Sequence, residues 1–431
     1  MSNPMRKPQF FTLLFFLFSL GGFLVQSCNK TSNIEPRLPY TVILNNEFTL
    51  LEARVGVFIT DDDGTVAAFS WLKGRDTTHF GLKYSDFDKY NCTIVKISVD
   101  RDSGTPDTLV EMTTYAHVPH NTVINLRVLE YEQEVNIKMQ FKNLSTLDSL
   151  IVPESEAIII PTQSNNYFGN FIVHYTGDFW LRAKFNGAPE WKYLLFNNFS
   201  QTPNTLYIDP NLMQTMTKLP HQINLPFESK WRYHIDGIID VDNVKLMPLV
   251  NILEEQDSKI PNTNQLRIYQ PDNLALNGYR LCLNGVKDIS KNYTFGIDRY
   301  YSILPNSIEL PDFNIESTLV NDRNRINIRC IGNFDALVVT RTISGTTKIN
   351  WSVYIPPVQD GDISNELPQV PKEMASLYPK LANKQFDNGT SVRAERYKLL
   401  FGFEDVQMTI FDNSDALWQP KNELSTIEKV F

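Results

Sequence analysis

The stretch that decides the fold is VNIKMQFK, residues 135–142. Apolar and polar side chains alternate along it, which places the apolar ones on a single face of an extended chain. The same period of two recurs in INIRC at residues 326–330 and in INWSVYI at residues 349–355. This pattern is typical of β-strands that bury one face, whereas an amphipathic helix repeats its apolar residues every three or four positions.

Turn-forming dipeptides separate many of these runs. They are Asp63-Gly64, Asn186-Gly187, Asp236-Gly237, Asn277-Gly278, Asn284-Gly285 and Asn388-Gly389. Each pair favours the positive φ angles of a tight hairpin turn. Short strands joined by such turns predict a mainly β protein built of antiparallel sandwiches, with one or two short helices.

Residues 55–71 carry a resemblance to known β-sandwich families. A strand over 55–60, the turn at Asp63-Gly64 and a strand over 66–71 resemble the opening hairpin of an immunoglobulin-like or carboxypeptidase-regulatory-like module. The resemblance implies tandem immunoglobulin-like domains. We expect β-rich domains over residues 41–128, 129–245 and 246–431, and a division of the last near 357–371 is an open alternative.

Two short helices are expected among the strands. Asp209 and Pro210 place a capping carboxylate before a first-turn proline, and apolar residues at helical spacing follow as far as Pro220. Pro371 opens the second helix, which Pro379 should end or kink. Both helices are expected to cover an edge or end of a sheet rather than to form a site.

The composition excludes several classes of protein. Of 431 residues, 42% are hydrophobic and 21% are charged, which is too apolar for a disordered chain. Lys and Arg total 40 against 49 Asp and Glu, and a net charge of -9 lacks the basic character of a nucleic-acid-binding protein. Four cysteines are too few for a disulfide framework. A bond between Cys282 and Cys330 is conceivable, but the two side with different faces of their strands, so we expect isolated thiols.

The N-terminus resembles a bacterial lipoprotein precursor. Arg6 and Lys7 precede an apolar run over residues 10–25, which is the layout of a secretory signal peptide. The run ends in LVQSC at residues 24–28, which resembles the lipobox of these precursors, with Gln26 as a departure from the usual small or apolar residue. The resemblance implies a signal peptide over 1–27, a lipid on Cys28 and a polar tether over 28–40. Two or more acyl chains would hold the protein on a lipid bilayer, since each buried methylene contributes ~0.8 kcal/mol.

The residues after Cys28 bear on the membrane that the anchor would enter. Asn29 stands where an Asp would imply retention at the inner membrane, so the resemblance implies the outer membrane. The sequence is similar in style to Bacteroidetes envelope lipoproteins, in which an acidic cluster after the cysteine favours surface display. Only Glu35 lies near, and the periplasmic face and the cell surface both stay open.

Linear motifs for catalysis and metal binding are absent from the sequence. No HExxH, GxSxG, GxGxxG, Walker A or CxxC pattern occurs. The acidic run that starts at Asp61 has neither the Gly nor the Glu that an EF-hand loop requires. His117 and His120 lie close together, but a zinc site needs further ligands that the sequence does not place nearby. We therefore expect no catalytic residue, no metal site and no cofactor.

Aromatic residues crowd in the expected second domain. The candidates are Trp180, Trp191, Tyr193, Trp231 and Tyr233. An exposed flat ring beside polar side chains could stack on a sugar ring, which makes these residues candidates for ligand binding. Buried aromatic residues are equally typical of a sandwich core, and this interpretation is favoured. Exposure of the three indole rings separates the two interpretations.

These observations support one leading hypothesis and two alternatives. The leading hypothesis is a non-catalytic, membrane-anchored envelope lipoprotein with a binding, adhesion or structural role. Its partners would be the bilayer through acylated Cys28 and glycans or envelope proteins, not nucleic acid. The alternatives are a glycan-binding lipoprotein of a nutrient-uptake system and a hydrolase whose active-site residues are dispersed over loops.

Overall fold

The computed structural model describes most of the chain beyond the N-terminal segment. The described residues are 37–44, 54–72, 77–83, 89–100, 107–126, 135–142, 147–152, 157–159, 166–173, 179–196, 205–240, 245–252, 262–288, 293–320, 325–358, 361–387, 389–400, 402–411 and 423–430. The predicted signal peptide, Cys28 and the tether as far as residue 36 lie outside these residues.

β-strands dominate the described residues, which confirms the predicted mainly β fold. The largest sheet has twelve strands. In spatial order they are β18 (Lys245–Ile252), β17 (Arg232–Asp240), β20 (Gly278–Asp288), β21 (Tyr293–Tyr301), β28 (Leu424–Val430), β27 (Thr390–Tyr397), β24 (Ala336–Ile343), β25 (Thr347–Ile355), β6 (Asp107–Pro119), β5 (Lys89–Asp100), β2 (Arg54–Thr60) and β3 (Val66–Leu72). Neighbouring strands run antiparallel except β25 and β6, which run parallel.

Five smaller sheets accompany the twelve-stranded sheet. Two pack near β2: β4 (Thr77–Lys83), β1 (Arg37–Leu44) and β7 (Val123–Leu126), and β22 (Asn314–Val320), β23 (Arg325–Ile331) and β26 (Asp362–Glu366). A pair consists of β16 (His221–Lys230) and β19 (Asn262–Ile268). The other two sheets are β10 (Ala157–Ile159), β9 (Leu147–Val152), β12 (Phe179–Phe185), β13 (Trp191–Phe196) and β15 (Gln214–Thr215), and β11 (Asn166–Val173), β8 (Val135–Lys142) and β14 (Thr205–Ile208).

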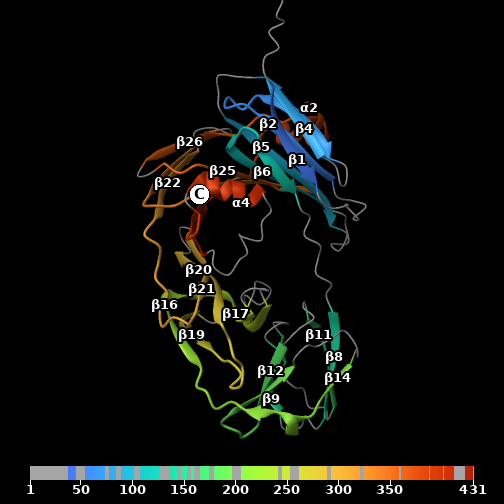
Figure 1. The fold of residues 1–431 in the computed structure, drawn as a ribbon, viewed down its shortest axis with the longest axis vertical. Coiled ribbons are helices and arrows are strands. Elements are labelled where there is room, and N and C mark those ends of the chain that lie inside the picture. The colour runs from blue at the N-terminus through green and yellow to red at the C-terminus, as the bar shows by residue number, and fades with distance from the viewer. Residues whose placement is uncertain are drawn as a thin grey trace, which may run out of the picture.

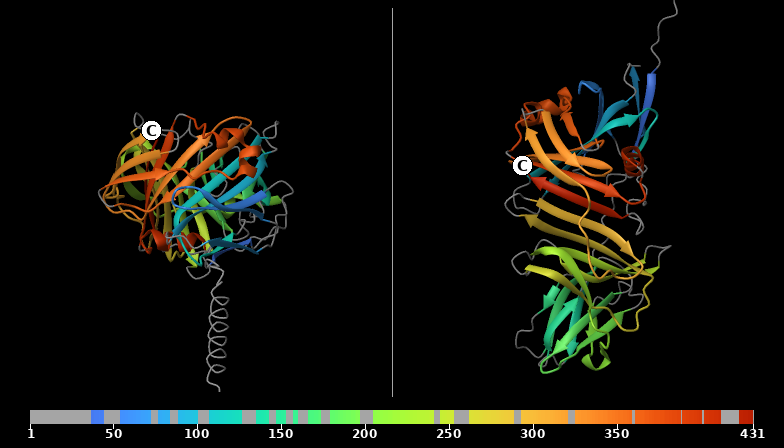
Figure 2. Two further views of the ribbon diagram at one scale, coloured as in Figure 1. Left: turned by 90° about the horizontal axis from the view of Figure 1, so that it is seen from above. Right: turned by 90° about the vertical axis from the view of Figure 1, so that its left-hand side faces the viewer.

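The molecule is elongated, and its sheets follow one another along the long axis (Figures 1 and 2). β1 and β4 lie at one end, which we call the proximal end, because the chain enters the fold there at β1. β8, β9, β11, β12 and β14 lie at the opposite end, which we call the distal end. The β16–β19 pair lies between the two ends, over β17, β20 and β21.

Two layers cover the twelve-stranded sheet at the proximal end. The β22–β23–β26 sheet and helices α2 (Lys372–Leu377) and α3 (Pro379–Ala382) share a core with Phe58 and Trp351. The β4–β1–β7 sheet and helix α4 (Phe403–Phe411) share a second core with Val57. Successive side chains of a strand point to opposite faces, so Val57 and Phe58 enter different cores. Burial of each such side chain stabilises the fold by about 1.5–3 kcal/mol.

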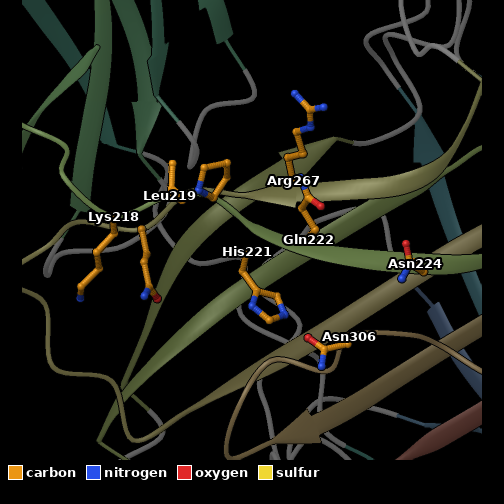
Figure 3. A pocket seen from close by; sticks show the side chains of 9 residues that line it. Lys218, Leu219, His221, Gln222, Asn224, Arg267 and Asn306 are labelled. Carbon is orange, nitrogen blue, oxygen red and sulfur yellow. The ribbon is translucent and has the colours of Figure 1, made fainter.

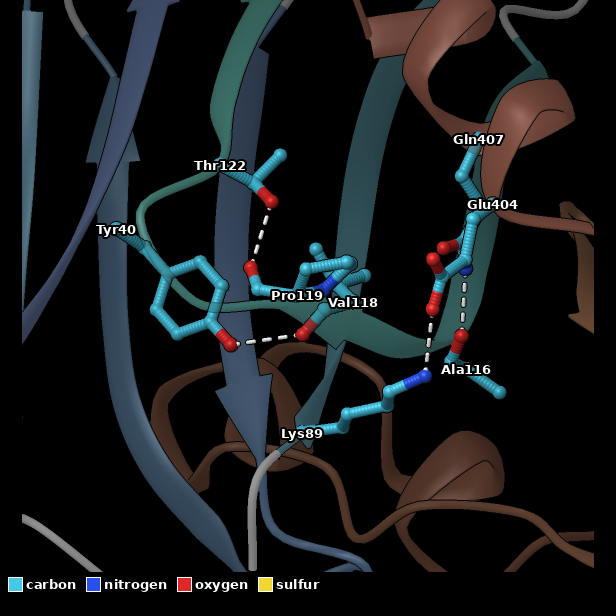
Figure 4. A network of polar contacts seen from close by, with 8 residues as sticks. All are labelled: Tyr40, Lys89, Ala116, Val118, Pro119, Thr122, Glu404 and Gln407. Carbon is cyan, nitrogen blue, oxygen red and sulfur yellow. Dashed lines mark hydrogen bonds and ion pairs between the residues drawn. The ribbon is translucent and has the colours of Figure 1, made fainter.

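Polar contacts hold β1 and α4 to the end of β6 (Figure 4). The Tyr40 hydroxyl of β1 donates a hydrogen bond of 2.9 Å to the Val118 carbonyl. The Gln407 amide of α4 donates one of 2.5 Å to the Ala116 carbonyl. Lys89 and Glu404 form an ion pair of 2.7 Å between β5 and α4. The first strand of the fold is therefore fastened to the body through a fully buried tyrosine.

Segments that are far apart in sequence share the twelve-stranded sheet. β6, from the expected domain over 41–128, pairs along its length with β25, from the expected domain over 246–431. Val110 and Met112 of β6 share one core with Ile349 and Trp351 of β25. The expected boundaries stay predictions, but the sheet runs without interruption across all three of the blocks that they define, since β17 comes from the block 129–245.

The predicted helices are partly confirmed. Pro371 precedes α2, and Pro379 begins α3, so the second helix is kinked at the expected place. The first prediction is wrong beyond one turn, because only the 3₁₀ turn Pro210–Leu212 forms, with the Asp209 carboxylate accepting from the Asn211 N–H. The following residues enter β15 instead, where pairing with β13 replaces helical hydrogen bonds. Helix α4 was not predicted.

Three of the predicted turns are wrong. Gly64 and Gly187 lie in turns with φ angles of 76° and 75°, as expected. Gly237 instead lies inside β17, and Gly278 and Gly285 lie in β20. A Cβ atom on Gly285 would lie 2.6 Å from the Trp231 ring, so this glycine makes room for a buried indole rather than turning the chain.

Among the described residues, no helix combines the length and the apolar composition needed to span a membrane.

Candidate functional site

An open polar groove lies at the outer face of the β16–β19 pair (Figure 3). Its volume is about 980 Å³. It is lined by Lys218, Leu219, Pro220, His221, Gln222, Asn224, Arg267, Gln270 and Asn306. We call this feature the groove.

Strand alternation produces the polar lining. Gln222 and Asn224 face outward on β16, while Ile223 between them is fully buried. Arg267 is the partner of Gln222 across the ladder and is also exposed, while Leu266 beside it is buried. The pair of strands therefore seals a core on one face and presents amides and a guanidinium on the other.

The loop that carries Asn306 closes one side of the groove. The Asn224 N–H donates a hydrogen bond of 2.8 Å to the Asn306 carbonyl, and the Ile308 N–H donates one of 2.9 Å to the Asn224 carbonyl. His221 Nε2 lies 3.0 Å from the Pro305 carbonyl, so this nitrogen is the donor in that contact. These backbone contacts fix the loop against the edge of β16.

Asp272 holds the other end of the groove. Its carboxylate accepts hydrogen bonds of 2.6 Å from both the N–H and the hydroxyl of Thr217, and one of 3.0 Å from the Lys218 N–H. Slight desolvation raises the pKa of Asp272, but these hydrogen bonds and the positive charge of Lys218 outweigh it and hold the pKa below the ordinary value. The ionised carboxylate therefore organises the backbone that carries the Lys218 ammonium group.

The groove has a positive lining in an acidic protein. Its nine lining residues include two strong cations, Lys218 and Arg267, and no carboxylate. Among the residues that the structure describes, neither cation forms an ion pair within 4.0 Å. The nearby Asp272 is engaged with the backbone of residues 217 and 218. An anionic or hydroxyl-rich ligand fits this distribution of donors.

A buried arginine stands behind the groove. The Arg182 guanidinium of β12 lies 4.1 Å from the centre of the Tyr269 ring and 4.8 Å from that of Trp191. Its Nε and Nη1 atoms are buried and have no hydrogen-bond partner within the described residues. Burial lowers the pKa of Arg182 to about 10. Tyr269 precedes the groove residue Gln270, so this contact joins the distal sheet to the groove wall.

Three of the five aromatic candidates belong to the core. Trp180, Tyr193 and Trp231 are 1%, 2% and 0% exposed. The Trp180 indole donates a hydrogen bond of 2.8 Å to the Pro248 carbonyl, and the Trp231 indole donates one of 3.2 Å to the Phe227 carbonyl. Burial and these internal partners leave no ring face for a sugar, so the stacking hypothesis is wrong for these three.

The other two aromatic candidates are partly buried. Trp191 contacts Arg182 and has Tyr269 at 6.0 Å between ring centres. Burial raises the pKa of Tyr233, and the Arg182 charge opposes this shift. Trp191 thus packs against the guanidinium of Arg182 rather than lining an open binding face. Cys28 lies outside the described residues, so its lipidation stays a prediction.

A second hollow, of about 560 Å³, differs in its charges. It is lined by Arg299, Glu309, Leu310, Pro311, Asp312, Arg396, Tyr397, Lys398, Glu423 and Ser425. Arg396 pairs with Asp312, and Lys398 pairs with Glu423 at 2.5 Å. We call this feature the paired hollow, because two of its cations already form ion pairs with its carboxylates.

A third hollow, of about 340 Å³, brings a histidine and a thiol together. His234, Cys282 and Asp298 lie side by side across β17, β20 and β21. Burial, with Asp298 nearby, raises the pKa of the Cys282 thiol well above its ordinary value. Asp298 binds Arg280 at 2.9 Å. The thiolate is the reactive form of a cysteine, so this shift disfavours Cys282 as a nucleophile.

Three cysteines lie in the described part of the chain. Cys92, Cys282 and Cys330 are free thiols, which confirms the expected isolated cysteines. Within the described residues, no group of three or more His, Cys, Asp or Glu side chains could hold a metal ion. The Asp61 carboxylate accepts a hydrogen bond of 2.7 Å from the Thr65 N–H, as in an ordinary hairpin turn.

Sequence reasoning missed the groove. Its residues come from segments near 220, 268 and 306, which only strand pairing and the loop contact bring together. A usable signal existed in residues 218–224, KLPHQIN, where polar residues alternate with Leu219 and Ile223 and no acidic residue occurs. That signal could have marked a cationic, amide-rich strand but not the partner segments.

Comparisons with known proteins show no family. No protein-family model and no curated protein match the chain. The tip fimbrial protein Mfa3 from Porphyromonas gingivalis, with a C-terminal truncation, is 11% identical over 38% of this chain and 81% of that chain, at a TM-score of 0.15. A fimbrial assembly protein from Parabacteroides distasonis is 8% identical over 40% of this chain and 90% of that chain, at 0.13. Similarities this slight carry no argument about function.

Proposed function

We propose that this chain is a lipid-anchored envelope protein with a non-catalytic binding, adhesion or structural role. The observation that carries the proposal is that the lipobox-like N-terminal sequence precedes the strand at one end of an elongated body. The lipobox-like residues 24–28 would place acyl chains on Cys28, and the described part of the chain starts with β1, at the proximal end of an elongated molecule (Figure 2).

The geometry suits presentation of a binding surface away from the membrane. An anchor that enters at the proximal end directs the groove and the distal sheets outward along the long axis (Figure 1). β1 is paired on both sides, antiparallel with β4 and parallel with β7. Its Tyr40 is fully buried and bonded to Val118, so tension on the tether passes into the body rather than peeling off one strand.

Contact between the distal sheet and the twelve-stranded sheet supports a structural or adhesive role. Trp180 and Tyr193 of the distal sheet belong to the same core as Phe295 of the twelve-stranded sheet and Trp231, which directly precedes β17. A shared core of this kind resists bending between the two parts, because separation would expose large apolar surfaces. A stiff body on a lipid anchor is the arrangement that a surface-presenting protein requires.

Metabolic labelling with a fatty acid tests the anchor. The wild-type chain should incorporate the label, and Cys28→Ser should abolish it, whereas Cys282→Ser, which changes a partly buried thiol, should retain it. A label that persists in Cys28→Ser, or that is absent from the wild type, would contradict the anchor.

An inserted epitope tests which side of the membrane the body faces. The turn at Asn186 and Gly187 is exposed, and a Cβ on Gly187 would have no neighbour within 4 Å, so it tolerates an insertion. Antibody binding to intact cells would show surface display. Binding only after the outer membrane is permeabilised would show the periplasmic face.

A further inference from the structure

We propose that the groove binds a segment of an acidic polysaccharide. Lys218 and Arg267 would contact its carboxylates, and the amides of the lining would contact its hydroxyl groups. This inference deepens the proposed binding role and rests on it, but it does not depend on the lipid anchor.

Charge is the first argument. The protein carries a net charge of -9, so an exposed surface should on average repel anions. The groove departs from this average, because its lining holds Lys218 and Arg267 and no acidic side chain. Unpaired cations in a hollow raise the local concentration of anions. An anionic ligand is therefore favoured over a neutral or cationic one.

The amide side chains are the second argument. Gln222, Asn224, Gln270 and Asn306 contribute four amides to the lining. A sugar hydroxyl both donates and accepts hydrogen bonds, as an amide does. The Asn224 Oδ1 atom already accepts from Gln265 at 3.1 Å and the Gln270 Oε1 atom from the Tyr279 hydroxyl at 2.8 Å, so these two amides offer a ligand mainly their N–H groups. Phe, Tyr and Trp are absent from the described residues that line the groove, so binding would rest on hydrogen bonds and charge rather than on ring stacking.

Extension is the third argument. Figure 3 shows the polar side chains spread along the strands, from Lys218 at one end to Asn224 and Asn306 at the other. At a rise of about 3.3 Å per strand residue, His221 and Asn224 alone stand roughly 10 Å apart. A single small anion cannot reach all of these groups, whereas a polymer segment can. Leu219, 91% exposed, offers an apolar contact for the carbon face of a sugar.

Affinity electrophoresis of the detergent-solubilised full chain in gels with polygalacturonate tests the proposal. We expect retardation that weakens as salt is raised, since the screening length falls from about 8 Å at 0.15 M to 3 Å at 1 M. Fully methyl-esterified polygalacturonate, which has the same backbone without the charge, should retard the chain much less.

Matched variants locate the site. Lys218→Gln and Arg267→Gln should each weaken binding by about two- to fivefold, the size of a solvent-exposed charge contact. Lys348→Gln and Arg329→Gln remove exposed cations from β25 and β23 and should leave retardation unchanged. All four positions are on the surface, so the variants should fold, and equal thermal midpoints would confirm it.

Three results would overturn the proposal. They are no retardation in polygalacturonate, equal loss of binding in the groove and control variants, and equal or stronger binding of polyglutamate, which would identify an acidic-peptide site instead. The outcomes for anchor and groove are separable. A chain that is labelled at Cys28 but not retarded loses only this inference, and a chain that is retarded but not labelled loses only the anchor.

Discussion

The groove and the paired hollow are two concave, polar surfaces of one molecule. They differ in whether their cations form ion pairs with acidic side chains. In the paired hollow, Arg396 and Lys398 already have Asp312 and Glu423 as partners. In the groove, Lys218 and Arg267 have no carboxylate among the lining residues. A cation in an ion pair stabilises the folded chain, whereas a cation without such a pair can still form one with an anionic ligand. The state of the charges, not the volume of the hollow, distinguishes the two.

The largest expected effect comes from reversing the charges at both places. Lys218→Glu with Arg267→Glu should weaken polygalacturonate binding at least about tenfold, with little change in stability. Arg396→Glu with Lys398→Glu should leave binding unchanged and lower the stability by about 1–2 kcal/mol, because two pairs become repulsions. Gel retardation and urea unfolding measure the two effects. Equal responses from both double variants would erase the distinction.

Substitution of Arg182, which lies behind the groove, should have the next largest effect. Arg182→Ala leaves a gap between Trp191 and Tyr269 and should lower the free energy of unfolding by about 1–3 kcal/mol. Arg182→Met fills the same space without buried, unpartnered donors, so its stability should stay within about 1 kcal/mol of the wild type. Urea unfolding of both variants provides the measurement. A larger loss in the methionine variant would show that the charge itself stabilises the junction.

A smaller effect should follow from making the paired hollow resemble the groove. Asp312→Asn with Glu423→Gln removes the partners of Arg396 and Lys398. This double substitution is added to a chain whose groove cations are neutralised by Lys218→Gln and Arg267→Gln. Polygalacturonate binding should then be about two- to fivefold tighter than in the chain that carries the neutralised groove alone. Gel retardation again provides the readout. No gain would mean that unpaired cations alone do not make a binding surface and that the amides of the groove are required.

The smallest expected effect is a pH dependence at Asp272. Its folded-state pKa is lowered, so its stabilising contribution is present above the unfolded value of about 3.9 and is lost as the pH falls through the folded pKa below that. The difference in thermal midpoint between the wild type and Asp272→Asn should therefore be constant from pH 7 to about pH 4.5 and shrink below about pH 3.9. A difference that vanishes at higher pH would contradict the hydrogen bonds to Thr217 and Lys218.

Local sequence patterns predicted the strands well and their interruptions less well. The alternation at residues 135–142 and 349–355 became β8 and most of β25. The dipeptides that contain Gly237 and Gly285 predict turns, but both glycines lie within strands, because a glycine that makes room for a bulky neighbour has the same letter as one that turns the chain. Helix α4 had a readable signal in Glu404 and Asp405 at its first turn.

The exposure of the aromatic residues could not be read from the sequence. Trp191 and Trp231 both stand in strand-like or strand-flanking surroundings, yet Trp231 is fully buried and Trp191 is partly exposed beside Arg182. The difference depends on which sheet covers each face, and that sheet comes from elsewhere in the chain. The residues that line the groove were missed for the same reason.

The sequence by itself determined the β-sheet class, the pattern of buried and exposed faces along each strand and the lipoprotein-like N-terminus, because each follows from neighbouring residues. Tertiary structure alone decided that β6 pairs with β25, that three of the candidate aromatic residues lie in the core, and that within the described residues Arg396 and Lys398 form close ion pairs while Lys218 and Arg267 do not. Arg396 and Asp312 are separated by 84 residues. Charge compensation depends on distances in space, and no local pattern encodes a contact across such a separation.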